Sequence, residues 1–97
     1  MKPLFWSPRA IRDLEAIRDY IALDSPAYAE LVVQRLVNAP ERLRQFPESG
    51  RIVPERSDAG LRELILRPFR MVYRLRGNSI EIVTVFHAAR LPSNLTE

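Results

Sequence analysis

Two helix-start signals of the same kind, Ser7-Pro8 and Ser25-Pro26, constrain the fold of this chain more than any other feature. A serine at the N-cap accepts a hydrogen bond from an amide of the first turn, and proline suits the first helical position because the N–H that it lacks has no partner there. Apolar residues at intervals of three and four follow each signal, which is the spacing of one helix face. We therefore predict two amphipathic helices that form an antiparallel hairpin.

The apolar face of each helix can be read from this spacing. The first helix carries Ala10, Leu14, Ile17 and Ile21, widened by Ile11 and Tyr20, and the second carries Tyr28, Leu31, Val32, Leu36, Ala39, Leu43 and Phe46. Pro40 lies within the second pattern, where it removes a backbone hydrogen bond and crowds the preceding turn. We expect a kink or a break in the helix at that point.

The second half of the chain reads as strands, at residues 61–66, 69–76 and 79–87, and the short apolar run 3–6 predicts a strand before the helices. Arg67-Pro68 marks a bend, and Gly77-Asn78 a two-residue hairpin loop. The predicted fold is α+β, with an N-terminal strand and an antiparallel helix hairpin packed on a C-terminal antiparallel sheet. The length of 97 residues predicts one domain, 1–97, and the polar residues 92–97 a frayed tail.

Composition limits the setting and the partners. The chain has no cysteine, no signal-peptide pattern and no apolar run long enough to cross a membrane, so we expect a soluble protein of the cytoplasm. The net charge is +3, and Lys2 is the only lysine among 15 basic residues. This arginine bias suits an acidic partner or a nucleic-acid-associated target, although solvated helix faces also carry arginine.

The hairpin loop sets the expected faces of the sheet. It pairs Arg74 with Glu81 and Arg70 with Val85. Side chains alternate along strands, so one face is predicted to carry Phe69, Met71, Tyr73, Leu75, Ile80, Ile82 and Phe86, and the other Arg70, Val72, Arg74, Glu81, Val83, Val85 and His87. We expect the apolar face to meet the helices and the other to stay open, with Arg70 and His87 as diagonal neighbours beside a strip of three valines.

Several motifs resemble those of the ParE branch of the RelE/ParE toxin superfamily, and the match covers nearly the whole chain in order. They are the opening Ser7-Pro8 with Asp13-Leu14, Ile17 and Tyr20-Ile21; the break Asp24-Ser25-Pro26; Phe46-Pro47 with Gly50-Arg51; Pro54-Glu55; Leu61-Arg62-Glu63-Leu64; Phe69-Arg70-Met71-Val72-Tyr73-Arg74; and Val85-Phe86-His87-Ala88-Ala89-Arg90. The resemblance implies the RelE/ParE fold and a type II toxin, of the kind linked to plasmid stabilization, that a cognate antitoxin encoded beside it neutralises.

The resemblance leaves two targets open. ParE-like toxins inhibit DNA gyrase, whereas RelE-like relatives cleave messenger RNA. The RelE-like enzymes carry additional lysines or arginines with a histidine, tyrosine or glutamate, but this chain has only Lys2 and no tyrosine after His87. This departure favours a gyrase inhibitor that is not an enzyme.

A metal-independent endoribonuclease is the alternative, with Arg70 as the cation for the scissile phosphate and His87 as the group that moves a proton. The structural interpretation of the same residues is that Arg70 holds a local carboxylate or carbonyl while His87 bonds to nearby backbone. A single histidine and no cysteine argue against a metal site or a nucleophilic triad, so we expect neither a metal nor another cofactor.

Binding is the function that the sequence favours. The candidate residues for contact with the antitoxin or the target are Arg70, Val72, Arg74, Val83, Val85, His87 and Arg90. The expected partners are an acidic antitoxin, whose disordered C-terminal segment lays a helix over the hairpin or adds a strand to a sheet edge, and DNA gyrase; no membrane and no small-molecule substrate is expected. A third hypothesis is a decayed toxin that retains only its antitoxin contact.

Overall fold

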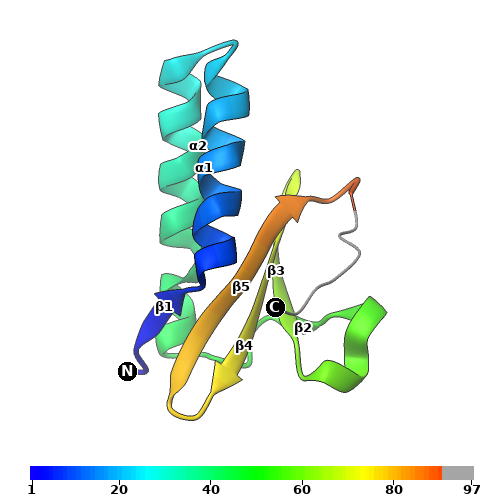
Figure 1. The fold of residues 1–97 in the computed structure, drawn as a ribbon. Helices are drawn as coiled ribbons and strands as arrows, with labels where there is room; N and C mark the ends of the chain where they lie inside the picture. Colours follow the sequence, from blue (N-terminus) through cyan, green and yellow to red (C-terminus); the bar gives the residue numbers. More distant parts are fainter. Residues whose placement is uncertain (91–97) are drawn as a thin grey trace.

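The structure is a computed structural model that describes residues 1–90, with only the backbone of Asp58 and Ala59; the predicted tail lies outside these residues. In chain order the elements are β1 Leu4–Trp6, α1 Pro8–Ala22, α2 Pro26–Asn38, the 3-10 helix η1 Ala39–Arg44, β2 Arg51–Ile52, the 3-10 helix η2 Pro54–Ala59, β3 Arg62–Leu66, β4 Phe69–Arg76 and β5 Ser79–His87 (Figure 1). The predicted α+β fold is confirmed, and β2 and η2 are additions to it.

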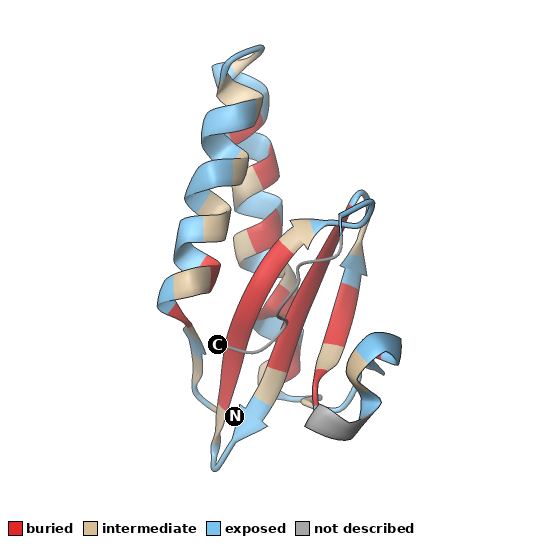
Figure 2. Ribbon diagram, turned by 45° about the vertical axis from the view of Figure 1, so that its right-hand side comes forward, coloured by how far each residue is buried: buried red, intermediate tan, exposed pale blue. Residues whose placement is uncertain are grey.

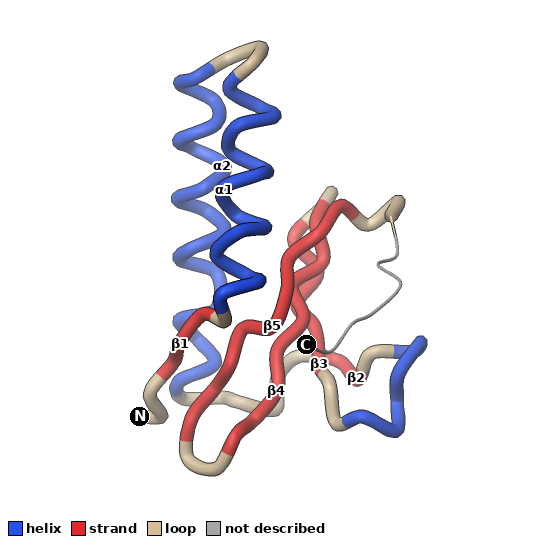
Figure 3. Tube along the Cα trace, viewed as in Figure 1, coloured by secondary structure: helices blue, strands red, loops and turns tan. Residues whose placement is uncertain are grey.

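The strands form one five-stranded sheet in the order β1-β5-β4-β3-β2 (Figure 3). β3, β4 and β5 follow one another along the chain and pair antiparallel, as predicted, and β2 pairs antiparallel with β3. The N-terminal strand β1 pairs parallel with β5, so the sheet is mixed. The helix hairpin lies against one face of this sheet.

Both predicted helix starts are present. The Ser7 hydroxyl accepts from the Ala10 amide at 3.0 Å, and the Ser25 hydroxyl accepts from the Tyr28 amide at 3.1 Å. Ser7 has a second role, because its hydroxyl also donates to the Val83 carbonyl at 2.8 Å. The start of α1 is thereby fixed to β5.

The second helix breaks where proline predicts it. Helix α2 ends at Asn38, and residues Ala39–Arg44 continue as the 3-10 helix η1. The break redirects the chain so that Leu43 is fully buried and the Arg44 carbonyl accepts from the Lys2 amide at 3.1 Å. Pro40 therefore turns one long apolar pattern into two elements.

The core lies between the helix hairpin and the sheet (Figure 2). Leu36 of α2 and Leu43 of η1 pack in one cluster with Met71, Tyr73 and Ile82 of the two central strands. Burial at about 25 cal/mol per Å² makes this apolar cluster the main source of stability. The face predicted to meet the helices does so at β4 and in the first half of β5.

Part of the predicted helix faces is exposed, both at the far end of the hairpin and away from it. Five residues placed on the buried helix faces are exposed, by fractions of 46% at Ile11, 76% at Tyr20, 57% at Tyr28, 68% at Leu31 and 63% at Phe46. The physical reason at the tip is that the hairpin extends past the end of the sheet, so no second layer covers Tyr20 and Tyr28 (Figure 1). Helical spacing gives the face of a helix but not the length of the surface that covers it.

Among the described residues, none of the helices is both long and apolar enough to cross a membrane.

Candidate functional site

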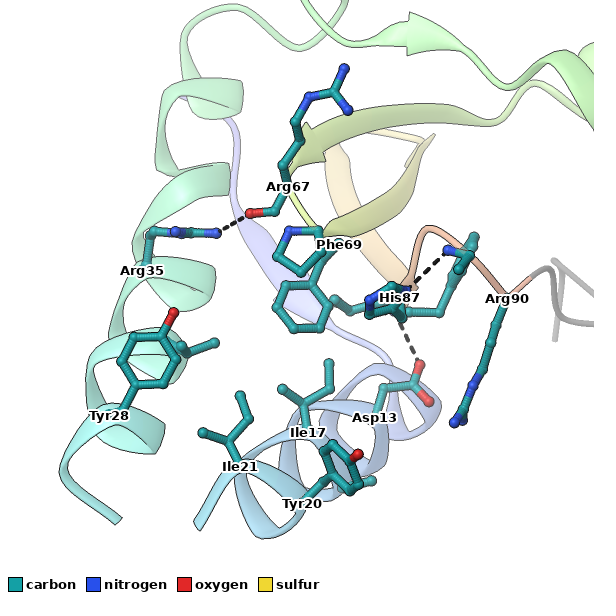
Figure 4. Close-up of a pocket in the computed structure, with 16 residues that line it drawn as sticks. Asp13, Ile17, Tyr20, Ile21, Tyr28, Arg35, Arg67, Phe69, His87 and Arg90 are labelled. Carbon is teal, nitrogen blue, oxygen red and sulfur yellow. Dashed lines mark hydrogen bonds between the residues drawn. The ribbon is translucent and has the colours of Figure 1, made fainter. Parts of the chain in front are cut away.

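A cleft of about 720 Å³ opens between the helix hairpin and the far end of the sheet (Figure 4). Its walls come from segments far apart in sequence, namely α1, α2, the β3–β4 turn and the end of β5. The lining includes Asp13, Ile17, Tyr20, Ile21, Tyr28, Val32, Arg35, Arg67, Phe69, Val85, His87 and Arg90. We take this cleft as the candidate site.

The floor of the cleft is apolar. Ile17 and Ile21 line it from α1, and the buried Val32 and Val85 line it from α2 and β5. Tyr20 and Tyr28 stand at the opening as exposed aromatic side chains, one from each helix (Figure 4). Aromatic residues around an apolar floor are typical of surfaces that bind another polypeptide.

The rim of the cleft carries positive charge. Arg35, Arg67 and Arg90 line it together with His87. The Arg35 guanidinium donates to the Arg67 carbonyl at 2.7 Å, which joins α2 to the β3–β4 turn. Asp13 is the acidic residue of the lining, and the backbone of β5 engages its carboxylate.

Asp13 and Ser7 close the edge of β5 that β1 leaves uncovered. The Asp13 carboxylate accepts from the Val85 amide at 3.1 Å and from the Thr84 hydroxyl. Ser7 covers the adjoining stretch, where its amide donates to the Ile82 carbonyl at 2.9 Å. An added strand would need these same backbone groups, so Ser7 and the Asp13 side chain of α1 block this edge.

The register of β5 differs from the prediction after Val83. The predicted pair of Arg74 and Glu81 is confirmed, with the Arg74 Nε 2.7 Å from the Glu81 carboxylate. Beyond it the ladder skips Val83, so that Tyr73 lies opposite Ile82 and Val72 opposite Thr84. Such a β-bulge places two residues of one strand against one of the other and reverses the later side chains.

Because of the bulge, the pairing of Arg70 and the faces of Val85 and Phe86 differ from the prediction. Arg70 pairs with Phe86, and the predicted pair with Val85 is wrong. Val85 packs in the core beneath the helices, whereas Phe86 joins the apolar residues of the opposite face. The Arg70 guanidinium lies 5.3 Å from the centre of the Phe86 ring, in cation–π geometry.

Arg70 and His87 lie on opposite faces of the sheet, so the predicted diagonal pair is wrong. His87 lies opposite Phe69, which belongs to the core beneath the helices, and the two rings meet edge to face at 6.1 Å. The His87 Nδ1 accepts from the Ala89 amide at 3.0 Å. These contacts match the structural interpretation of His87, and its ring lines the cleft (Figure 4).

Arg70 is enclosed by carboxylates on the reverse face. Its Nε donates to Glu63 at 2.7 Å, and its Nη2 donates to Glu55 at 2.8 Å. Glu63 is buried and also accepts from Arg51. The hydrogen bond from Arg70 lowers the pKa of Glu55, and the hydrogen bond to Glu55 raises the pKa of Arg70 in return.

The reverse face is covered where the prediction left it open. Val72 and Val83 are buried, and they pack with Val53 and Leu61, which flank η2. The prediction of an apolar strip open to a partner is therefore wrong. Residues 54–60 are mostly polar and carry no apolar pattern that would indicate this cover.

The motif residues of the middle of the chain meet at one point. The Tyr73 hydroxyl accepts from the Gly50 amide at 2.9 Å and donates to the Pro47 carbonyl at 2.8 Å. Burial raises the pKa of this hydroxyl. A Cβ at Gly50 would lie 2.6 Å from the Tyr73 ring and 2.7 Å from the Glu63 carbonyl, so only glycine fits.

The sequence prediction thus named His87, Val85 and Arg90 of the cleft but missed most of it. The missed residues include the polar and aromatic side chains of Asp13, Tyr20, Tyr28, Arg35 and Arg67. Tyr20 and Tyr28 could have been found from the sequence. They closely flank the Asp24-Ser25-Pro26 break on either side, and the hairpin therefore brings both to its tip. In the described part of the chain no group of three or more histidine, cysteine or acidic residues could hold a metal ion.

Comparison with solved structures defines the class. The fold matches the chromosomal ParDE toxin–antitoxin system of P. aeruginosa with a TM-score of 0.78 and 33% identity, over 90% of this chain and 96% of that chain. The toxin–antitoxin complex RelBE2 of Mycobacterium tuberculosis matches with a TM-score of 0.59 over 89% of this chain and 96% of that chain, and at 20% identity it supports the fold alone. The protein has the RelE/ParE toxin fold.

The sequence comparisons give the family. The family described as ParE toxin of the type II toxin-antitoxin system parDE matches residues 4–92. The toxin RelE2 of Caulobacter vibrioides is 40% identical over 92 residues, which are 94% of this chain and 100% of that protein. The putative toxin Y4kP of Sinorhizobium fredii is 40% identical over 89 residues, 90% of this chain and 88% of its own length. The chain belongs to the ParE toxin family of type II toxin–antitoxin systems.

Proposed function

We propose that this toxin acts by binding rather than by cleavage, that its target is DNA gyrase, and that its cleft receives a segment of a cognate antitoxin. Gyrase inhibition would take place in the cytoplasm. The names of the relatives do not choose between the two targets, since one is called RelE2 and the family is that of ParE. The choice depends on the placement of two side chains.

The observation that carries the proposal is the engagement of Arg70 by two carboxylates. An endoribonuclease without a metal needs a cation for the scissile phosphate and a proton-transfer group within reach of one substrate. Arg70 is held by Glu63 and Glu55 on the reverse face, and its exposed fraction is only 8%. His87 lies on the other face of the sheet, and its Nδ1 accepts from the Ala89 amide. Both residues line a second cavity at the end of the sheet, but the guanidinium of Arg70 is engaged there by carboxylates, which disfavours a catalytic role for the pair.

The antitoxin is proposed to enter the cleft as a helix. The apolar floor of the cleft and its two exposed tyrosines suit the apolar face of an amphipathic helix. The arginines at the rim of the cleft suit acidic residues around that face. Strand addition at β5 is disfavoured because Ser7 and Asp13 already hold the edge backbone. An acidic segment that is disordered alone and folds on binding fits this site.

The target is tested by expression and by a purified assay. Expression of the chain alone should stop bacterial growth, with early loss of DNA synthesis and SOS induction in pulse-labelling, and the purified chain should inhibit supercoiling by gyrase. The variant His87→Ala should remain equally toxic, because His87 has no catalytic part in this proposal. Prompt arrest of translation, or a folded His87→Ala protein without toxicity, would instead support the endoribonuclease.

The antitoxin is tested by rescue. Co-expression of the protein encoded beside this toxin should restore growth, and the two should purify as one complex. Harmless expression of soluble, folded wild-type chain would contradict the toxin activity and favour a decayed copy that keeps only its antitoxin contact.

A further inference from the structure

A second surface lies at the end of the molecule opposite the cleft, where three segments meet. They are the N-terminal residues, η1 and the turn between β4 and β5 (Figure 1). The Lys2 amide donates to the Arg44 carbonyl at 3.1 Å, and the Lys2 ammonium donates to the Asn78 side chain at 3.3 Å. These two bonds join the three segments into one surface. We call it the basic end and include in it the loop after η1 and the start of β3, which are joined where the Arg62 guanidinium donates to the Glu48 carbonyl at 3.1 Å.

The basic end holds an excess of positive charge. Its cations are Lys2, Arg42, Arg44, Arg62, Arg74 and Arg76, and its acids are Glu41, Glu48 and Glu81. Six cations against three acids leave an excess of three, which equals the formal net charge of +3 of the whole chain. The rest of the sequence is therefore balanced, and the surplus lies at one end.

Several of these arginines are held in place. The Arg44 Nε is 2.7 Å from Glu41, and the Arg62 Nη1 donates to the Gly50 carbonyl at 2.8 Å. Glu81 accepts from Arg74 at 2.7 Å and from Arg76 at 3.5 Å, so that one carboxylate serves two cations. Restrained arginines lose little side-chain entropy on binding, and their other N–H donors suit phosphate oxygens.

The arrangement fits an extended polyanion. The cations are spread around a turn, and both the cleft and a second cavity beside Ile65, Pro68 and Ala88 lie at the other end of the sheet. Duplex DNA presents about one charge per 1.7 Å of its axis, at fixed spacing. The phosphates of a flexible single strand have no fixed spacing, so restrained guanidinium groups favour the duplex. We propose that the basic end binds the phosphate backbone of duplex DNA, independently of the cleft.

The test is fluorescence anisotropy of the purified full chain with a labelled DNA duplex of arbitrary sequence, titrated at several salt concentrations. Changing Lys2, Arg42 and Arg76 together to glutamine should lower the affinity at least tenfold and reduce the slope of log K against log salt by about 2 to 3. The matched control changes Arg12, Arg18 and Arg56, which lie on α1 and η2, to glutamine and should stay within about twofold of the wild type.

The outcomes separate this proposal from its rivals. Salt-independent or absent DNA binding by the wild type, equal losses in both triple variants, or tighter binding to a single strand of the same length would overturn it. The wild type could also fail to bind DNA while the triple variant at the basic end loses gyrase inhibition. That outcome would assign the basic end to a protein partner and overturn the proposal of DNA binding as well. Circular dichroism checks folding, and the double variant Arg42→Gln with Arg76→Gln replaces the triple variant if that one unfolds.

Discussion

At the scale of single residues, two motifs of the sequence are explained by one contact. Gly50 has no side chain because Tyr73 occupies that space, and the Tyr73 hydroxyl in turn satisfies the Gly50 amide. The same turn receives Arg62, which donates to the Gly50 carbonyl. Residues that lie far apart in the chain are thus tied to a single fit between a backbone and an aromatic ring.

Replacing Gly50 by alanine should destabilise the fold by about 1 to 3 kcal/mol, the usual cost of overpacking, because the new methyl group would meet both a ring and the fixed Glu63 backbone. Urea unfolding followed by circular dichroism measures this loss. Ser49→Ala is the matched control at the neighbouring exposed position and should change stability by less than about 0.5 kcal/mol. Equal stability of the two variants would contradict the contact.

Glu55 should make the stability of the protein depend on pH. Arg70 lowers the pKa of this carboxyl in the folded state below its ordinary value of 4.5, so its contribution is present above that value and is lost as the pH falls through the folded pKa. The difference in unfolding free energy between the wild type and Glu55→Gln should therefore be largest near neutral pH and shrink toward pH 3. Urea unfolding at several pH values measures it, and a difference that grows in acid would refute the ion pair.

At the scale of elements, the two serine caps can be compared directly, because both cap a helix but only Ser7 also bonds to β5. Ser25→Ala removes only an exposed cap and should cost about 1 kcal/mol. Ser7→Ala removes a cap and also leaves the buried Val83 carbonyl without its donor, so it should cost about 2 to 3 kcal/mol. Thermal and urea unfolding of both variants give the comparison. Equal costs would mean that the bond between Ser7 and β5 contributes nothing.

Most elements could be predicted from local patterns. The Ser-Pro starts, the break at Pro40 and the Gly77-Asn78 turn each have a local physical cause, and β4 and β5 have the predicted bounds. The bulge at Val83 could not be predicted, because the run from Val83 to Val85 is β-branched throughout and its polar residue, Thr84, is buried, so that it does not mark an open face. The parallel pairing of β1 and the cover over Val72 depend on distant segments, and so does the cleft.

At the scale of the whole molecule, the hairpin tip exposes tyrosines that add nothing to the core of the isolated chain. Changing Tyr20 and Tyr28 to alanine should leave the unfolding temperature within a few degrees of the wild type but weaken antitoxin binding by tenfold or more, as for residues at the centre of an interface. Calorimetry with the purified antitoxin measures the affinity. Leu23→Ala at the same tip is the control, since Leu23 is exposed but does not line the cleft. Equal binding by all these variants would place the antitoxin elsewhere.

The skipped residue in β5 also has a consequence for insertions and deletions. Deleting Val83 would let Ile82 and Thr84 follow each other in an unbroken ladder, and every residue from Thr84 to His87 would keep its present partner on β4. Deleting a residue two positions later would instead turn His87 over and remove it from the cleft. The first deletion should therefore keep the face of β5 that lines the cleft, at the cost of the bond from Ser7 to the Val83 carbonyl and of the buried Val83 side chain. An equal deletion two positions later should lose partner recognition.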